Sequence, residues 1–159
     1  MAWNYLAMEG LIVARLQAEV PALLQVKTAA AAAAAEGQVT QAPAAIVGLQ
    51  GDAPAAPEAR LTKGQLAAFA QNQSTAQRWG VVVAVRNVRD IQSGAAAREE
   101  AGPLLSAVIL ALAGWTPDEA RYWPLVRVPA GTPRYGSGRL LYPLSFETRL
   151  IVTPEKLTA

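Results

Sequence analysis

Residues Gln77 to Asn87, with the sequence QRWGVVVAVRN, give the strongest strand signal in the chain and decide how we expect it to fold. A nearly continuous run of β-branched residues is typical of a central strand that is covered on both faces. Trp79 precedes this run, and we expect its ring to fill the edge of a small core. The β-branched residues are Val81, Val82, Val83 and Val85.

A second strand is predicted near the C-terminus, from Leu144 to Val152. Its side chains alternate with a period of two, which is the pattern of a strand with one buried face. The predicted inward face consists of Leu144, Phe146, Thr148, Leu150 and Val152, and the outward face of Ser145, Glu147 and Arg149. Shorter strands are expected at Ala22–Val26, Ala44–Leu49, Leu125–Val128 and Arg139–Tyr142, with a turn at Gly136-Ser-Gly138 and a loop at Gly51–Arg60.

Two principal helices are predicted, one before and one after the valine strand. Asn4 to Glu19 places apolar residues three and four positions apart, which is the spacing of a helix with one buried stripe. Gly94 to Ala113 has a wider apolar stripe, in which Pro103 either kinks the helix or marks its start, and Gly114 is placed to end it. The first stripe contains Tyr5, Met8, Ile12 and Leu16.

Two further segments leave alternatives open. Thr28 to Glu36 carries a run of alanines, which favours either a short helix capped by Thr28 or a low-complexity surface segment. Leu61 to Gln73 fits either a strand that pairs with the valine strand or a short helix. The order of the elements nevertheless predicts one α+β domain over residues 1–159, with a mainly antiparallel sheet and two principal helices packed on one face.

The composition narrows the chemistry. The 159 residues include no cysteine and no histidine, and 14 basic against 12 acidic residues give a formal charge of +2. These absences remove the thiolate nucleophile, the commonest metal ligand and the usual proton-transfer group near neutral pH. The adjacent acids Glu99 and Glu100 suit the first turns of a helix for dipole reasons alone. We therefore predict that the chain is not an enzyme and has no catalytic residues, cofactor or metal site.

The aromatic residues suggest contact surfaces instead, because Trp and Tyr dominate the buried centres of protein interfaces. Several of them lie at predicted element ends and in loops. The N-terminus lacks a signal-peptide pattern, and the longest apolar run, Leu104 to Trp115, is too short to cross a bilayer of about 30 Å. We expect a soluble protein without a membrane partner. The predicted interface residues are Trp3, Trp115, Tyr122, Trp123 and Tyr135.

Four stretches of the sequence resemble one known family. They are GVVVAVRNVRD at Gly80–Asp90, VPAL at Val20–Leu23, Leu112-Ala-Gly-Trp115 and the closing strand around Phe146-Glu-Thr-Arg149. Together with the two helices, they are similar to the phage tail-terminator, or tail-completion, proteins. The resemblance covers most of the chain outside Thr28–Asn72.

This resemblance implies a structural virion protein of the tail and neck, assembled in the host cytoplasm. Six copies would form a ring that caps the tail tube, stops its elongation and joins it to the neck. The implied partners are the chain itself, the tail tube protein, the neck or connector proteins and, where the tail has one, the sheath protein. Genomic DNA would only pass through the lumen. Gly51–Gln73 and Pro129–Gly138 are the loops expected to contact the tube or the neck.

Two other functions remain open from the sequence. One is another head–tail connector or neck-completion protein, which would share the ring but bind the portal side. The other is a small nucleic-acid-binding module, for which no concentrated basic stripe is visible. A small hydrolase is disfavoured because the chain offers no base for a serine nucleophile. The arginines available for a nucleic acid are Arg78, Arg86, Arg89, Arg121 and Arg127.

Overall fold

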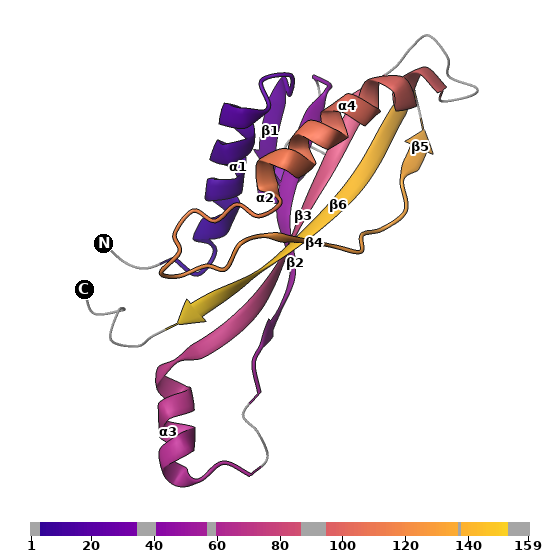
Figure 1. Ribbon diagram of the computed structural model, residues 1–159. Coiled ribbons are helices and arrows are strands. Elements are labelled where there is room, and N and C mark those ends of the chain that lie inside the picture. Colours follow the sequence, from indigo (N-terminus) through magenta and orange to yellow (C-terminus); the bar gives the residue numbers. More distant parts are fainter. Residues whose placement is uncertain (1–3, 35–40, 57–59, 87–94, 137, 153–159) are drawn as a thin grey trace.

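Two helices cover one face of a six-stranded sheet in the computed structural model, which describes residues 4–34, 41–56, 60–86, 95–136 and 138–152 (Figure 1). The helices are α1 (Ala7–Glu19), α2 (Ala29–Ala34), α3 (Lys63–Gln71) and α4 (Ala95–Leu112). The strands are β1 (Gln25–Thr28), β2 (Ala44–Pro54), β3 (Gln73–Arg86), β4 (Val126–Val128), β5 (Arg134–Gly136) and β6 (Arg139–Val152). The predicted α+β class is confirmed.

The sheet is antiparallel except at one edge. Its strand order is β1-β2-β3-β6-β4, and β5 also pairs with β6. Only β1 and β2 run parallel, joined through the short helix α2. The valine strand β3 is therefore central, as predicted, between β2 and β6.

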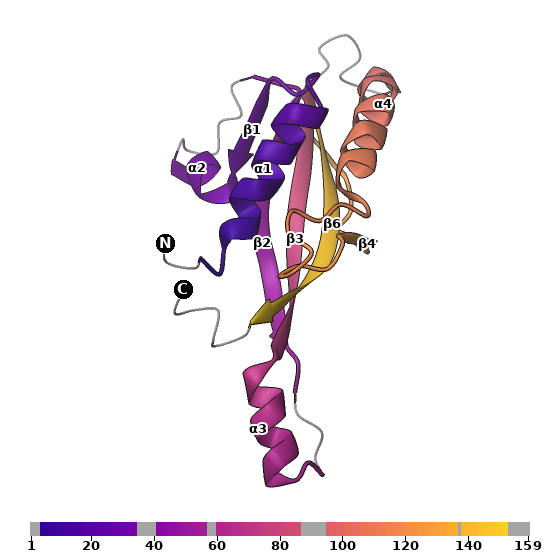
Figure 2. The ribbon, with the colours of Figure 1, turned by 60° about the vertical axis from the view of Figure 1, so that its left-hand side comes forward.

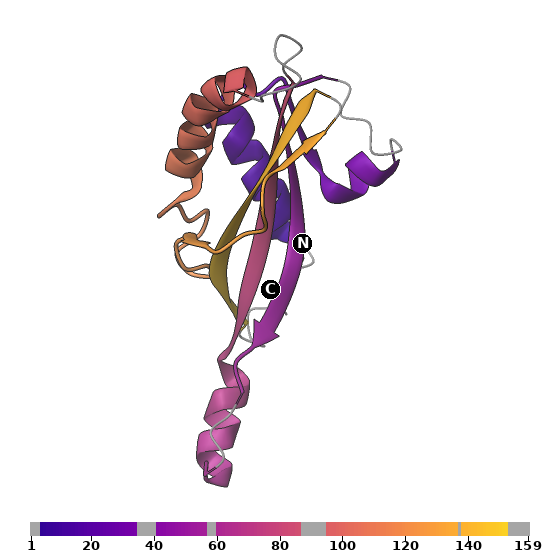
Figure 3. The same ribbon diagram turned by 90° about the vertical axis from the view of Figure 1, so that its right-hand side faces the viewer.

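The main core lies between the sheet and the helices α1 and α4, which pack side by side (Figure 2). The predicted stripe of α1 is buried at Met8, Ile12 and Leu16. Figure 3 shows these two helices on one side of the sheet and α2 on the other. Alternate residues of β3 face the α1–α4 side, so the odd-numbered valines are buried there, whereas Val82 points to the second face and is half-buried.

An aromatic pair occupies the centre of this core. Trp79 on β3 lies directly opposite Phe146 on β6, and both side chains are fully buried. Cross-strand neighbours of this kind are the units that stabilise a sheet. Trp79 therefore belongs to the interior of the core rather than to its edge, where the sequence had placed it.

The second face of the sheet contains a polar bridge that depends on a glycine. The Gln50 side chain crosses over Gly80, and its Oε1 accepts a hydrogen bond of 2.7 Å from the Ser145 hydroxyl. A Cβ at Gly80 would lie 2.5 Å from Gln50 Nε2, so a larger residue at this position would displace the Gln50 side chain. The pairing of β2 with β3 shifts register between Leu49 and Gly51, which releases Gln50 from the ladder as a β-bulge.

Two strands are longer than predicted. Arg139–Tyr142 and Leu144–Val152 form one strand, β6, that runs through Pro143. Pro143 lies between the part of β6 covered by β5 and the part covered by β4, so its missing N–H costs no hydrogen bond on that edge. The predicted loop Gly51–Arg60 is wrong for its first residues, because β2 continues to Pro54 by pairing with β3.

A helical extension projects beyond the far end of the sheet. The last strand pairs are Pro54 with Thr75 and Gln73 with Val152, and α3 lies beyond them (Figure 1). We call residues 60–72 the arm. The range Gly51–Gln73, predicted as a loop, therefore contains a helix. Of the strand and the short helix predicted for Leu61–Gln73, the helix is confirmed.

Candidate interaction surfaces

Trp123 is the most prominent aromatic residue on the surface. Its backbone N–H donates to the carbonyl of Arg149 at 2.9 Å, and its own carbonyl accepts from the Thr148 hydroxyl. The indole is 52% exposed, with the Arg149 guanidinium 5.1 Å from the ring centroid. The backbone is thus fixed to the edge of β6 while a cation–π pair presents the ring to solvent.

Trp115 lies at the end of α4 and is half-buried against the main core. The Arg15 guanidinium lies 5.5 Å from its ring centroid. Arg15 also donates from Nε to the carbonyl of Ala111 at 3.1 Å and forms an ion pair of 2.8 Å with Glu19. Trp115 and Arg15 therefore join α1 to α4 within the subunit, while part of the indole stays accessible.

The remaining aromatic candidates occupy different environments. Tyr135 on β5 is 55% exposed, whereas Tyr122 is 4% exposed and packs in the main core. Trp3 lies outside the described residues. An interface role stays a prediction for all five, and of the described four, Trp123 and Tyr135 present the largest accessible rings.

The burial of Tyr122 has a consequence for stability at alkaline pH. Burial raises the pKa of its phenol above the ordinary value of 10.0; the Arg121 charge opposes this rise and the Asp118 charge adds to it. Above about pH 10 the unfolded chain loses this proton before the folded one does, so stability falls as the pH rises. We expect Tyr122→Phe to reduce that fall, measured as the free energy of urea unfolding across this range. An unchanged slope in the variant would contradict the assignment.

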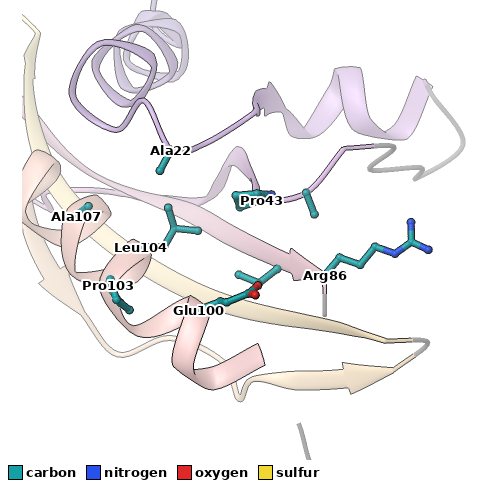
Figure 4. Close-up of a pocket in the computed structure, with 9 residues that line it drawn as sticks. Ala22, Pro43, Arg86, Glu100, Pro103, Leu104 and Ala107 are labelled. Carbon is teal, nitrogen blue, oxygen red and sulfur yellow. The ribbon is translucent and has the colours of Figure 1, made fainter. Parts of the chain in front are cut away.

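A hollow of about 410 Å³ opens at the end of the sheet opposite the arm (Figure 4). Its walls are mainly apolar and come from the turn after α1, the residues just before β2, the end of β3 and the middle of α4. The carboxylate of Glu100 turns into the hollow, whereas the Arg86 guanidinium points away from it. The wall residues include Ala22, Pro43, Val85, Pro103, Leu104 and Ala107.

The second face of the sheet has a smaller hollow of about 300 Å³. It lies beside Val82, Leu141 and Pro143 and is bordered by Arg134 of β5. Arg86 and Arg139 are direct cross-strand partners at the same end of the sheet. This end is therefore basic among the described residues.

The arginines proposed for a nucleic acid do not form one track. Arg78 pairs with Glu147 at 3.7 Å, and Arg121 pairs with Asp118 at 3.8 Å. Arg127 lies on β4 at the opposite edge from β1, and Arg89 is outside the described residues. Two of these charges are thus matched by acids within the subunit.

Metal-ligand clusters and membrane-spanning helices are both lacking in the described part of the chain. Within the described ranges, no three acidic, histidine or cysteine side chains are grouped so that they could hold a metal ion. None of the described helices combines the length and the apolar character needed to span a bilayer.

Comparison with known proteins identifies a matching family. The family model described as phage tail terminator protein matches residues 1–156. No curated protein matches the chain. The matched range includes the arm, both principal helices and all six strands.

Proposed function

The chain belongs to the phage tail terminator family, and from this premise we propose that it forms a ring that caps the tail tube, ends its elongation and joins it to the neck. Members of this family are structural components of phage tails. The resemblance found in the sequence is confirmed, and it extends over Thr28–Asn72 as well.

The single observation that carries the proposal is the match over nearly the whole chain. The shape of the subunit supports a ring. Its two ends differ: one has an apolar hollow (Figure 4), and the other has a projecting helix (Figure 1). A contact between unlike ends is heterologous, and such contacts close into rings when the rotation between neighbours divides a full turn.

The mechanism we propose is steric. The ring binds the end of the tube and covers the surface to which the next tube subunit would add. The surface segment Pro129–Gly138, which contains β5 and the exposed Tyr135, is our candidate contact with the tube or the neck. Loops supported by a rigid sheet are suited to this role.

Native mass spectrometry at several concentrations tests the ring. We expect a species of six times 16.7 kDa, about 100 kDa, to increase as the concentration rises. A strict monomer at every concentration would contradict a ring that forms without the tube. Tube assembly in the presence of the protein then tests termination separately, because a terminator shortens tubes even where the ring needs the tube as a template.

A further inference from the structure

We propose that the arm of one subunit docks through α3 into the apolar hollow at the α4 end of a second copy of the chain. This proposal rests on the proposed ring and specifies one interface between neighbouring subunits. It places a specific helix in a specific hollow, so it can fail while the ring itself stands.

The helix α3 has no partner of its own in the described part of the subunit. None of its residues is buried, and no described helix or strand packs substantially against it. Leu66 is 47% exposed on the face that it shares with Phe69 and Ala70. A helix of nine residues is marginal in water, because most helical stability in proteins comes from packing one apolar face.

Local interactions nevertheless hold α3 in shape. The Thr62 hydroxyl accepts from the Gln65 N–H at 3.3 Å, and the Gln65 side chain accepts from the Thr62 N–H at 2.9 Å. This capping box fixes the first turn without any tertiary contact. The result is a preformed apolar helix held away from the core, which loses little conformational entropy when it docks.

The hollow suits such a helix in size and character. Its volume of about 410 Å³ exceeds the ~150 Å³ that one leucine-sized void occupies, so more than one large side chain can enter. Pro103, Leu104 and Ala107 of α4 form one wall, and Ala22 and Pro43 form the other (Figure 4). Leu66 and Phe69, which are one helical turn apart, can enter between these walls together.

Opposite charges flank the two surfaces. Arg60 and Lys63 lie at the start of α3. The charged residues that line the hollow are Glu100, whose carboxylate turns into it, and Arg86, whose guanidinium points away from it. Lys63 sits in the first turn of its helix, where the macrodipole disfavours a cation. In the proposed contact, Lys63 would instead face Glu100 of a second copy.

Geometry requires the two surfaces to belong to different subunits. The 14-residue strand β3 begins beside α3 and ends at Arg86 beside the hollow. At 3.3 Å per residue, this strand separates them by about 46 Å. An arm cannot reach the hollow of its own subunit. Each copy instead gives one arm and receives another, which is the head-to-tail contact of a ring.

Charge reversal tests the contact at positions that the fold tolerates. Lys63 and Glu100 are both exposed, so Lys63→Glu or Glu100→Lys leaves the subunit folded. We expect each single variant to weaken association by roughly tenfold, because like charges would face each other across the interface. The double variant restores the opposite charges and should recover most of the loss. Glu119→Lys, an exposed charge reversal away from the hollow, is the matched control.

Engineered cysteines test which parts of two copies meet. The chain has no cysteine of its own, so every disulfide must come from the introduced pair. We expect Ala67→Cys combined with Ala107→Cys to give a ladder of covalent oligomers on oxidation. A mixture of the two single variants should give a covalent dimer and nothing larger. The pair Ala67→Cys with Ala30→Cys, which places the second thiol on α2, should give no ladder.

The outcomes separate this contact from the proposed function. Rings of wild-type stability in both charge variants, with no cysteine ladder, would overturn the docking of α3 and leave the ring in place. A cysteine pair that shortens tubes but gives no ladder when oxidised on those tubes would also overturn it and leave the terminator function standing. Rescue by the double charge variant together with a specific ladder would establish the contact.

Discussion

Trp79→Ala is expected to lower the free energy of unfolding by about 3–5 kcal/mol, the usual cost of truncating a large buried aromatic residue. Trp79 is fully buried at the centre of the sheet, opposite Phe146. Domains of ordinary size are stable by only about 5–15 kcal/mol, so the variant should lose a large part of its stability. Urea unfolding followed by circular dichroism measures the change.

Trp79→Phe is the matched comparison. The indole Nε1 is buried and has no hydrogen-bond partner among the described residues, so replacing it with a carbon ring removes an unsatisfied donor. We expect Trp79→Phe to cost far less than Trp79→Ala. Equal losses in the two variants would show that ring volume is not what Trp79 contributes. A double-mutant cycle with Phe146→Leu should reveal a coupling of about 0.5–1.5 kcal/mol beyond buried area.

Trp123→Ala is expected to separate assembly from stability. The indole is 52% exposed and contacts Arg149, so its removal should change the free energy of unfolding by only about 1 kcal/mol. We propose that the Trp123 indole anchors a contact between proteins in the assembled tail. Truncating a tryptophan at the centre of such an interface costs about 2–4 kcal/mol of binding free energy. Ring or tube association should therefore weaken at least 30-fold, measured by native mass spectrometry and by tube assembly.

Trp115→Ala provides the contrast. Trp115 is half-buried and packs with Arg15 between α1 and α4, so this variant should lose stability as well as association. Wild-type assembly in both Trp123→Ala and Trp115→Ala would rule out the aromatic interface. Weaker assembly in Trp115→Ala alone would point to loss of the subunit's own packing.

The sequence predicted helices and strands best where the spacing of apolar residues matched the spacing of residues on the buried side of the element. The stripe of α1, the valines of β3 and the alternation of β6 all predicted elements that the structure contains. In each case, the residues that showed the pattern are the ones that form the main core. The family resemblance used these same segments.

The arm was harder to predict because none of the residues of α3 is buried, so no buried face imposes a regular spacing of apolar residues. Its helix is held by Thr62 and Gln65 rather than by burial, and a Thr followed three residues later by Gln is a recognised helix start. That signal was present in Leu61–Gln73 and would have favoured the helix. The length of β2 was underestimated because Gly51 and Pro54 are typical of loops, although pairing with β3 carries the strand past both.

The aromatic candidates show the same limit. Trp115, Tyr122 and Trp123 lie close together in the sequence, yet one is half-buried, one buried and one exposed. Their order along the chain carries no period that distinguishes these environments. The hollow beside Glu100 was also beyond sequence analysis, since it is formed by segments from four separate parts of the chain.

The bulge at Gln50 also bears on what the free protein does before any tail exists. Beyond Val47 no described strand covers the outer edge of β2, which leaves a stretch of backbone available for strand-to-strand polymerisation. The register shift at Gln50 interrupts that stretch, and the proline at position 54 ends it. Bulges and prolines are the features by which exposed edges resist pairing with other chains. Both features therefore disfavour edge-to-edge pairing of the free subunit with another chain.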